Sequence, residues 1–246
     1  MDEKIENAEM KIKSPLGEKI ENFFYHYKWH TIVALFLVFT IVICSLQMCQ
    51  KVSYDIHIMY AGGEEIGKTA SGGDISEYQK LNSALMRVTP DFDENEERNV
   101  NLLTLFIPSD KEIEEIKKSE GYELNIGMVL ENQNIFQQNI LYSEYSICLL
   151  SESLFLEWSE NQAVTLFAPI GQYTNGNTED YDFVNEYGIR LASTSLYESA
   201  GIQILPEDTV ICIRVFSEVS SRFNKAENQE NYNRSTVVLR EMLKNG

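Results

Sequence analysis

The segment from Asp91 to Leu102, DFDENEERNVNL, places oxygen-bearing side chains at the spacing of a calcium-binding loop. Asp91, Asp93 and Asn95 occupy positions one, three and five, which supply oxygen ligands in such loops. Glu96 stands at position six, which ordinarily needs glycine, and Leu102 stands at position twelve, which needs a bidentate glutamate. Two structures therefore remain open: an acidic turn, or a degenerate Ca2+ site of Asp91, Asp93 and Asn95. No other cofactor is expected.

Residues for acid–base or nucleophilic catalysis are scarce. The three histidines are His26 and His30, at the start of an apolar run, and His57, in a segment of alternating polarity. With histidine at these positions alone, the rest of the chain has too few histidines for a histidine metal cluster or a catalytic triad. Carboxylates are abundant, but in an acidic chain their number says little about glycosidase geometry. We expect no enzyme and no catalytic residues; a hydrolase acting through carboxylates is an alternative.

Small and acidic residues follow two of the strand-like segments. AGGEE comes after the first of them and SES after the third. In a parallel sheet the carboxyl ends of the strands share one edge, and ligands bind outside that edge. The predicted ligand-binding rim therefore consists of Gly62, Gly63, Glu64, Ser151 and Glu152.

The secondary-structure elements that would position this rim are predicted strands and helices that alternate along the chain. Strand patterns cover Val52–Tyr60, Asn99–Pro108, Tyr145–Leu150, Gly188–Ala192 and Thr209–Phe216. Helices are predicted after a capping box of Asp74 and Glu77, after a second box of Ser109 and Glu112, over Met128–Leu141, from Ser151 onward and over Tyr232–Lys244. Strands separated by helices predict an α/β domain with a single, mainly parallel sheet that helices flank.

The first half of this domain resembles a known family. The segments YDIHIMYAGG, VNLLTLFI and YSICLLSESLF, with helices between them, are similar to the first lobe of type II extracellular solute-binding proteins over residues 52–160. The resemblance implies a solute-binding-like α/β lobe, and the length of the chain allows one lobe rather than two. The whole chain also resembles uncharacterised single-span membrane proteins of Gram-positive bacteria, through its YKWH entry to the apolar run.

An apolar run determines where this domain would work. No charged residue stands between Thr31 and Gln50, which is long enough for most of a bilayer core of about 30 Å. Aromatic residues and Lys28 precede the run, and the exit CSLQMC lacks a small-x-small cleavage site, so a signal-anchor is predicted rather than a cleaved signal peptide. Residues 1–28 form the predicted cytoplasmic tail, 29–50 the transmembrane helix, and 51–246 the extracytoplasmic domain in a single-pass protein of the cell membrane. This orientation follows from the lysines Lys11, Lys13, Lys19 and Lys28 on the entry side.

Charge limits the partners. The chain carries 38 acidic and 20 basic residues, a net charge of −18, which excludes nucleic acid as a favoured partner. No basic residue stands between Lys118 and Arg190. That stretch is either a solvated acidic face or a binding surface for a cationic partner.

Cys148 and Cys212 sit inside apolar runs, where buried free thiols are expected, although a bridge between them stays open. From these patterns we expect a membrane-anchored extracytoplasmic domain that binds a ligand or an envelope protein. The alternative is a structural or assembly subunit of an envelope complex.

Overall fold

A computed structural model of the chain describes residues 15–49, 53–67, 75–118, 124–142, 144–160, 165–174, 179–199, 201–216 and 225–244. The chain divides into two compact units, Met1–Val52 and Ser53–Gly246. We call the second unit the C-terminal domain.

The first unit contains the helix α1, Pro15–Cys49. Proline suits the first helical position because its missing N–H would have no partner there. The 22 residues Tyr25–Leu46 are predominantly apolar and are not buried in protein, and they extend roughly 33 Å at about 1.5 Å per residue. Trp29, Phe36 and Phe39 are each more than half exposed. This helix is long and apolar enough to span a membrane, as predicted, and its helical structure begins well before residue 29.

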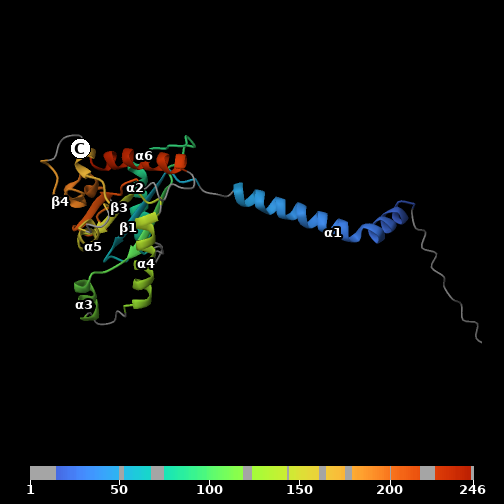
Figure 1. The fold of residues 1–246 in the computed structure, drawn as a ribbon, viewed down its shortest axis with the longest axis horizontal. Coiled ribbons are helices and arrows are strands. Elements are labelled where there is room, and N and C mark those ends of the chain that lie inside the picture. The colour runs from blue at the N-terminus through green and yellow to red at the C-terminus, as the bar shows by residue number, and fades with distance from the viewer. Residues whose placement is uncertain are drawn as a thin grey trace, which may run out of the picture. The chain divides into compact units, whose positions relative to one another are not determined.

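The C-terminal domain is built on a six-stranded mixed sheet in the order β2-β1-β3-β6-β5-β4 (Figure 1). The strands are β1 (Ile56–Gly62), β2 (Val100–Phe106), β3 (Ile147–Ser151), β4 (Phe183–Asn185), β5 (Gly188–Arg190) and β6 (Thr209–Ile213). The strands β2, β1 and β3 run parallel, whereas β6, β5 and β4 each run antiparallel to the neighbouring strand.

The prediction of a mainly parallel sheet is therefore wrong for the second half of the domain. Parallel neighbours need a long crossover, usually a helix, between them. The segment between β5 and β6 instead contains the short 3₁₀ turns η2 (Leu191–Ser193) and η3 (Ser195–Glu198), and β4 and β5 form a tight hairpin through Glu186 and Tyr187. The three-residue strand β4 was not predicted from the sequence.

Helices cover both faces of the sheet (Figure 1). The helices are α2 (Glu77–Val88), α3 (Asp110–Lys118), α4 (Ile126–Tyr142), α5 (Glu152–Ser159) and α6 (Lys225–Met242), and a third 3₁₀ turn, η1, covers Ile170–Tyr173. Alternate residues of β1 point to opposite sides: Ile58 and Tyr60 pack with α2 and α6, and Met59 and Ala61 pack with α4 and α5. Burial on both faces explains why β3 and β6 are continuously apolar.

The two predicted capping boxes have different outcomes. Ser109 and Glu112 form the predicted box, in which Glu112 accepts the Ser109 backbone N–H at 2.6 Å. At α2 the box is formed by Ser76 and Gln79 instead, two residues later than predicted. Asp74 lies outside the described residues.

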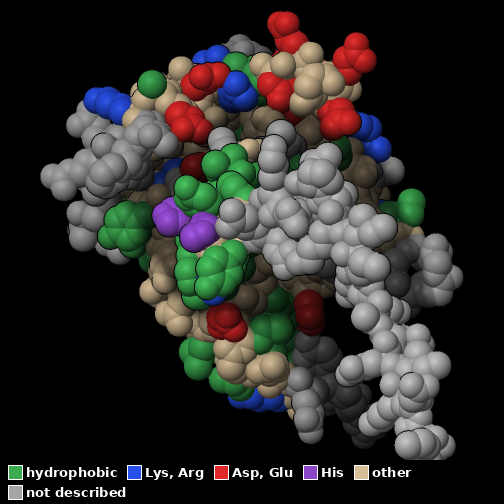
Figure 2. All heavy atoms as spheres, turned by 90° about the vertical axis from the view of Figure 1, so that its right-hand side faces the viewer, with side chains coloured by type: hydrophobic (Ala, Val, Ile, Leu, Met, Phe, Trp, Pro, Cys, Tyr) green, Lys and Arg blue, Asp and Glu red, His purple; other side chains and the backbone are tan. Residues whose placement is uncertain are grey.

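Acidic side chains do not form one continuous patch on the face drawn in Figure 2, where they lie among Lys and Arg side chains and neutral residues.

Candidate functional site

Two residues of the predicted rim lie side by side at the carboxyl ends of β1 and β3. A Cβ atom built on Gly62 would lie 3.3 Å from the Cβ of Ser151 and 2.9 Å from the Tyr60 hydroxyl oxygen. Glycine is needed at position 62 because the Tyr60 side chain folds back over it and accepts the Glu64 backbone N–H at 3.3 Å. The structure therefore brings Gly62 and Ser151 of the predicted rim together, but both residues are buried.

Glu152 already has a partner within the protein. Its Oε1 accepts a hydrogen bond from the Arg190 guanidinium at 2.8 Å, and Arg190 also contacts the Asp182 carboxylate at 3.2 Å. The Ser151 hydroxyl lies 3.4 Å from the Ser153 hydroxyl. Arg190 ends β5, which runs antiparallel to β6, so tertiary structure brings this cation to the rim. These contacts give Ser151 and Glu152 a structural role at the sheet edge.

Carboxylates gather beside Gly63. A Cβ on Gly63 would overlap the Glu112 carboxylate, whose oxygen also accepts the Ser109 hydroxyl at 2.6 Å. Burial raises the pKa of Glu64 above its usual range, and the neighbouring charges of Glu112 and Glu77 raise it further. Glu64 therefore holds a proton more readily than an isolated glutamate does.

A cleft of about 510 Å³ lies next to the rim, between the turn after β2 and the helices α4 and α5. We call it the α4–α5 cleft. Its apolar part consists of Ile107, Pro108, Phe136, Leu154 and Trp158, and its polar part of Ser109, Asp110, Lys111, Gln133, Gln137, Ser153 and Glu157. Polar residues outnumber apolar ones in this lining, and the volume lies within the range of roughly 300–1,000 Å³ that is typical of small-molecule sites.

The aromatic wall of the cleft is held by packing. Phe136 is 1% exposed, and its ring meets the Trp158 ring edge to face at a centroid distance of 5.5 Å. Trp158 is partly exposed, so part of its ring is available to a ligand. Phe136 comes from α4 and Trp158 from α5, and both helices cover the same face of the sheet.

Sequence reasoning missed this cleft. Its rim prediction included the segments after the first and third strands but not the one after the second, where Pro108 and Ser109 line the cleft. The spacing of Gln133 and Gln137, one helical turn apart, was the available signal on α4.

The predicted calcium loop acquires a ligand from a distant part of the chain. Asp91 and Asp93 lie with Asp55 so that one carboxylate oxygen from each falls within 4.8 Å of the others. The Asn95 amide instead donates to Asp93 at 3.0 Å, and its oxygen accepts the Glu97 backbone N–H at 2.7 Å. The structure thus groups three carboxylates, of which only Asp91 and Asp93 were predicted.

The loop achieves its sharp turns without glycine. Glu94 and Glu96 adopt positive φ values of 55° and 67°. Asp91 stabilises this backbone by accepting the N–H groups of Asn95 at 3.3 Å and Glu96 at 2.8 Å. Glu96 thus adopts the backbone conformation for which a calcium loop normally uses glycine at position six. Position twelve, however, is Leu102 and lacks the bidentate glutamate.

Comparisons of this chain with protein-family models, with curated proteins and with solved structures find no match. Its function must therefore follow from its own residues, chiefly the apolar helix α1 and the α4–α5 cleft.

Proposed function

We propose that this chain is a membrane-anchored, non-enzymatic binding protein whose C-terminal domain lies outside the cell and takes a small ligand in the α4–α5 cleft. The cleft carries the proposal, because an aromatic wall and several polar side chains converge there on a space of small-molecule size. The resemblance of residues 52–160 to one lobe of type II extracellular solute-binding proteins is consistent with this role.

The cleft lining supports binding rather than catalysis. The side chains that form it include neither histidine nor cysteine. Its two carboxylates, Asp110 and Glu157, are exposed, whereas a carboxylate that acts as a general acid is usually shielded from water. The lining therefore has the chemistry of recognition: amides, hydroxyls and an indole ring.

The membrane part of the proposal rests on α1. Its exposed apolar stretch matches the thickness of a bilayer, and the lysines before it favour a cytoplasmic N-terminus. Protease added to intact spheroplasts should digest the C-terminal domain and leave a short membrane-held N-terminal fragment. Protection of the full-length chain until the membrane is opened would reverse the orientation, and a mature N-terminus between Ser45 and Lys51 would identify a cleaved signal peptide.

Ligand binding can be tested with two matched variants. Full-length protein in detergent is screened by thermal shift against saccharides, peptides and polyamines. Gln137→Trp fills the cleft, whereas Gln138→Trp changes the adjacent exposed residue, which does not line it. We expect a ligand that stabilises the wild type and the Gln138 variant but not the Gln137 variant. If no compound stabilises the wild type, or if both variants respond alike, the proposed binding role is wrong.

A structural or assembly subunit of an envelope complex is the second candidate. Ile126 and Leu130 lie one turn apart on α4 and are 48% and 55% exposed. Adjacent exposed apolar side chains are typical of contact sites between proteins. Light scattering of the detergent-solubilised protein tests this role: an oligomer that Leu130→Glu dissociates would support it, and a monomer would count against it.

A further inference from the structure

We infer that the α4–α5 cleft binds a neutral carbohydrate, an inference that rests on the proposed binding function. The first observation is Trp158. Its partly exposed ring lines the cleft and is held in place by the edge-to-face contact with Phe136. The carbon-bound hydrogens of a sugar ring form an apolar face, which packs well against an aromatic surface that is already fixed.

The second observation concerns the side-chain amides of Gln133 and Gln137. Both line the cleft from successive turns of α4, and neither has a hydrogen-bond partner within the part of the chain that the structure describes. Each amide offers two donors and an acceptor. Sugar hydroxyls also donate and accept, so a row of hydroxyls can satisfy both amides together.

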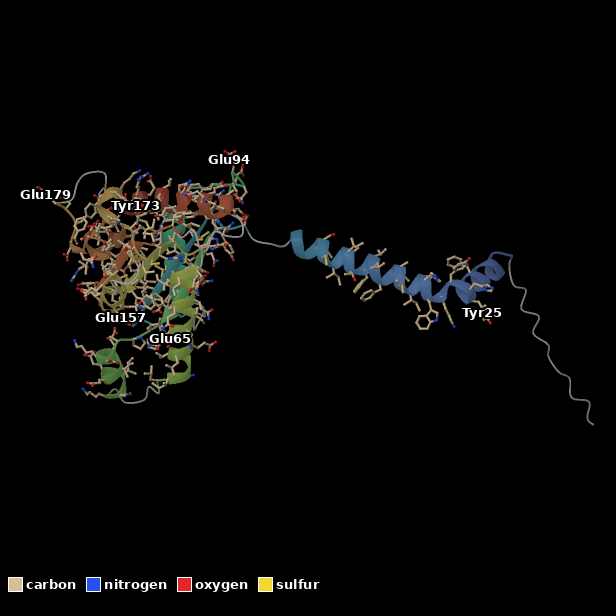
Figure 3. All side chains as sticks on the ribbon, viewed as in Figure 1. Tyr25, Glu65, Glu94, Glu157, Tyr173 and Glu179 are labelled. Atoms are coloured by element: carbon tan, nitrogen blue, oxygen red, sulfur yellow. The ribbon has the colours of Figure 1, made fainter. Side chains whose placement is uncertain are left out.

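The third observation concerns the remaining polar groups. Ser153 lines the cleft from α5, and Glu157, labelled on α5 in Figure 3, adds a carboxylate acceptor. A carboxylate can accept hydrogen bonds from two adjacent hydroxyls of one sugar. Polar groups thus surround the apolar base on more than one side, as a ligand with hydroxyls around its whole edge requires.

Charge argues against the two ionic classes of ligand. The cleft contains Lys111 as well as Asp110 and Glu157, so a polycation would meet a positive group beside the acids. An anionic ligand would be repelled by a chain whose net charge is −18. A neutral polyhydroxyl ligand meets neither difficulty.

The chain has two tryptophans, Trp29 and Trp158, so a Trp29→Phe variant leaves Trp158 as its single fluorescent indole. This full-length protein is solubilised in a detergent without a sugar headgroup, which could otherwise occupy the cleft. Cellotetraose, maltotetraose and tetra-N-acetylchitotetraose are the neutral carbohydrate probes, and spermidine and a mixed tripeptide pool are the comparison ligands.

At least one tetrasaccharide should change Trp158 fluorescence saturably. Gln137→Leu should weaken that binding roughly three- to tenfold, the effect of one lost hydrogen bond, and Gln138→Leu should leave it unchanged. Gln137 is exposed, so its variant is expected to keep the melting temperature of the parent, which thermal unfolding verifies.

Three results overturn the inference. In the first result, no tetrasaccharide alters Trp158 fluorescence, while spermidine or a peptide binds the wild type but not the Gln137→Trp variant. The cleft is then a binding site for another class of ligand, and the proposed function survives. If no ligand of any class binds, the inference and the proposed function both fail. If a saccharide binds equally to the Gln137→Leu and Gln138→Leu variants, its site lies elsewhere.

Discussion

Cys148 and Cys212 lie directly opposite each other on β3 and β6, and the Cys212 thiol donates to the Cys148 carbonyl oxygen at 3.6 Å. The neighbouring pair Ser146 and Arg214 is hydrogen-bonded through the Arg214 N–H, so alternation makes the cysteines a hydrogen-bonded pair too, with Cα atoms about 5.5 Å apart. That separation would allow a disulfide, yet both thiols are free and fully buried, as the apolar context predicted.

Burial should make these thiols unreactive. It raises the pKa of the Cys212 thiol, which suppresses the reactive thiolate. In a variant with Cys44 and Cys49 replaced by Ala, we expect no reaction with Ellman's reagent in the native state and two thiols per chain after denaturation. Rapid native labelling, or a mass lower by two hydrogens with no titratable thiol, would contradict the buried dithiol.

Asp55 should be important for stability. It is 3% exposed, and its two oxygens accept the backbone N–H groups of Phe92 and Asn99, each at 2.8 Å. Asp55→Ala leaves these donors without a partner and should lower the free energy of unfolding by about 3 kcal/mol. Glu97→Gln, at an exposed carboxylate of the same loop, should change it by less than about 0.5 kcal/mol. Urea unfolding measures both, and equal effects would show that Asp55 does not anchor the loop.

Calcium distinguishes the two structures left open for the loop at Asp91. A calcium site predicts that CaCl2 at about 1 mM raises the melting temperature, by roughly 2–4 °C for each kcal/mol of binding energy. Asp93→Asn should abolish that rise and, without calcium, slightly stabilise the protein, because Asp93 lies close to the carboxylates of Asp55 and Asp91. An acidic turn predicts no difference between CaCl2 and an equal concentration of MgCl2.

His57 should make stability depend on pH. Its Nδ1 lies 3.0 Å from the Asn101 amide nitrogen, its Nε2 lies 3.3 Å from Glu144, and its ring meets the edges of Tyr54 and Tyr145. Burial lowers the pKa of His57 below its ordinary value of 6.5, and Glu144 offsets part of that shift. The unfolded chain therefore binds a proton at higher pH than the folded chain does.

The contribution of His57 is accordingly complete above about pH 6.5 and is lost as the pH falls from there toward its folded pKa. Urea unfolding between pH 7.5 and 5.5 should show a steeper loss of stability for the wild type than for His57→Gln. Glu144→Gln should make the loss steeper still, because it removes the charge that favours the protonated ring. Parallel profiles for the three proteins would show that another group is responsible.

Local features of this protein could be read from the sequence because they depend on neighbouring residues alone. The apolar length of α1 and the Ser109–Glu112 box are of this kind, and so are the alternation that placed β1 and the apolar run that placed β3. Each follows from backbone geometry over a few turns or residues.

Tertiary structure decided what depends on distant segments. Strand β6 runs antiparallel to its neighbours, since short 3₁₀ turns rather than a crossover helix connect β5 to β6. The carboxylate group at Asp91 includes Asp55 because the backbone N–H groups of Phe92 and Asn99 donate hydrogen bonds to Asp55. The α4–α5 cleft combines the end of β2 with two helices that pack on the same face of the sheet. Sequence patterns report which residues are buried, but not which buried surfaces meet, because packing between elements depends on side chains far apart in the chain.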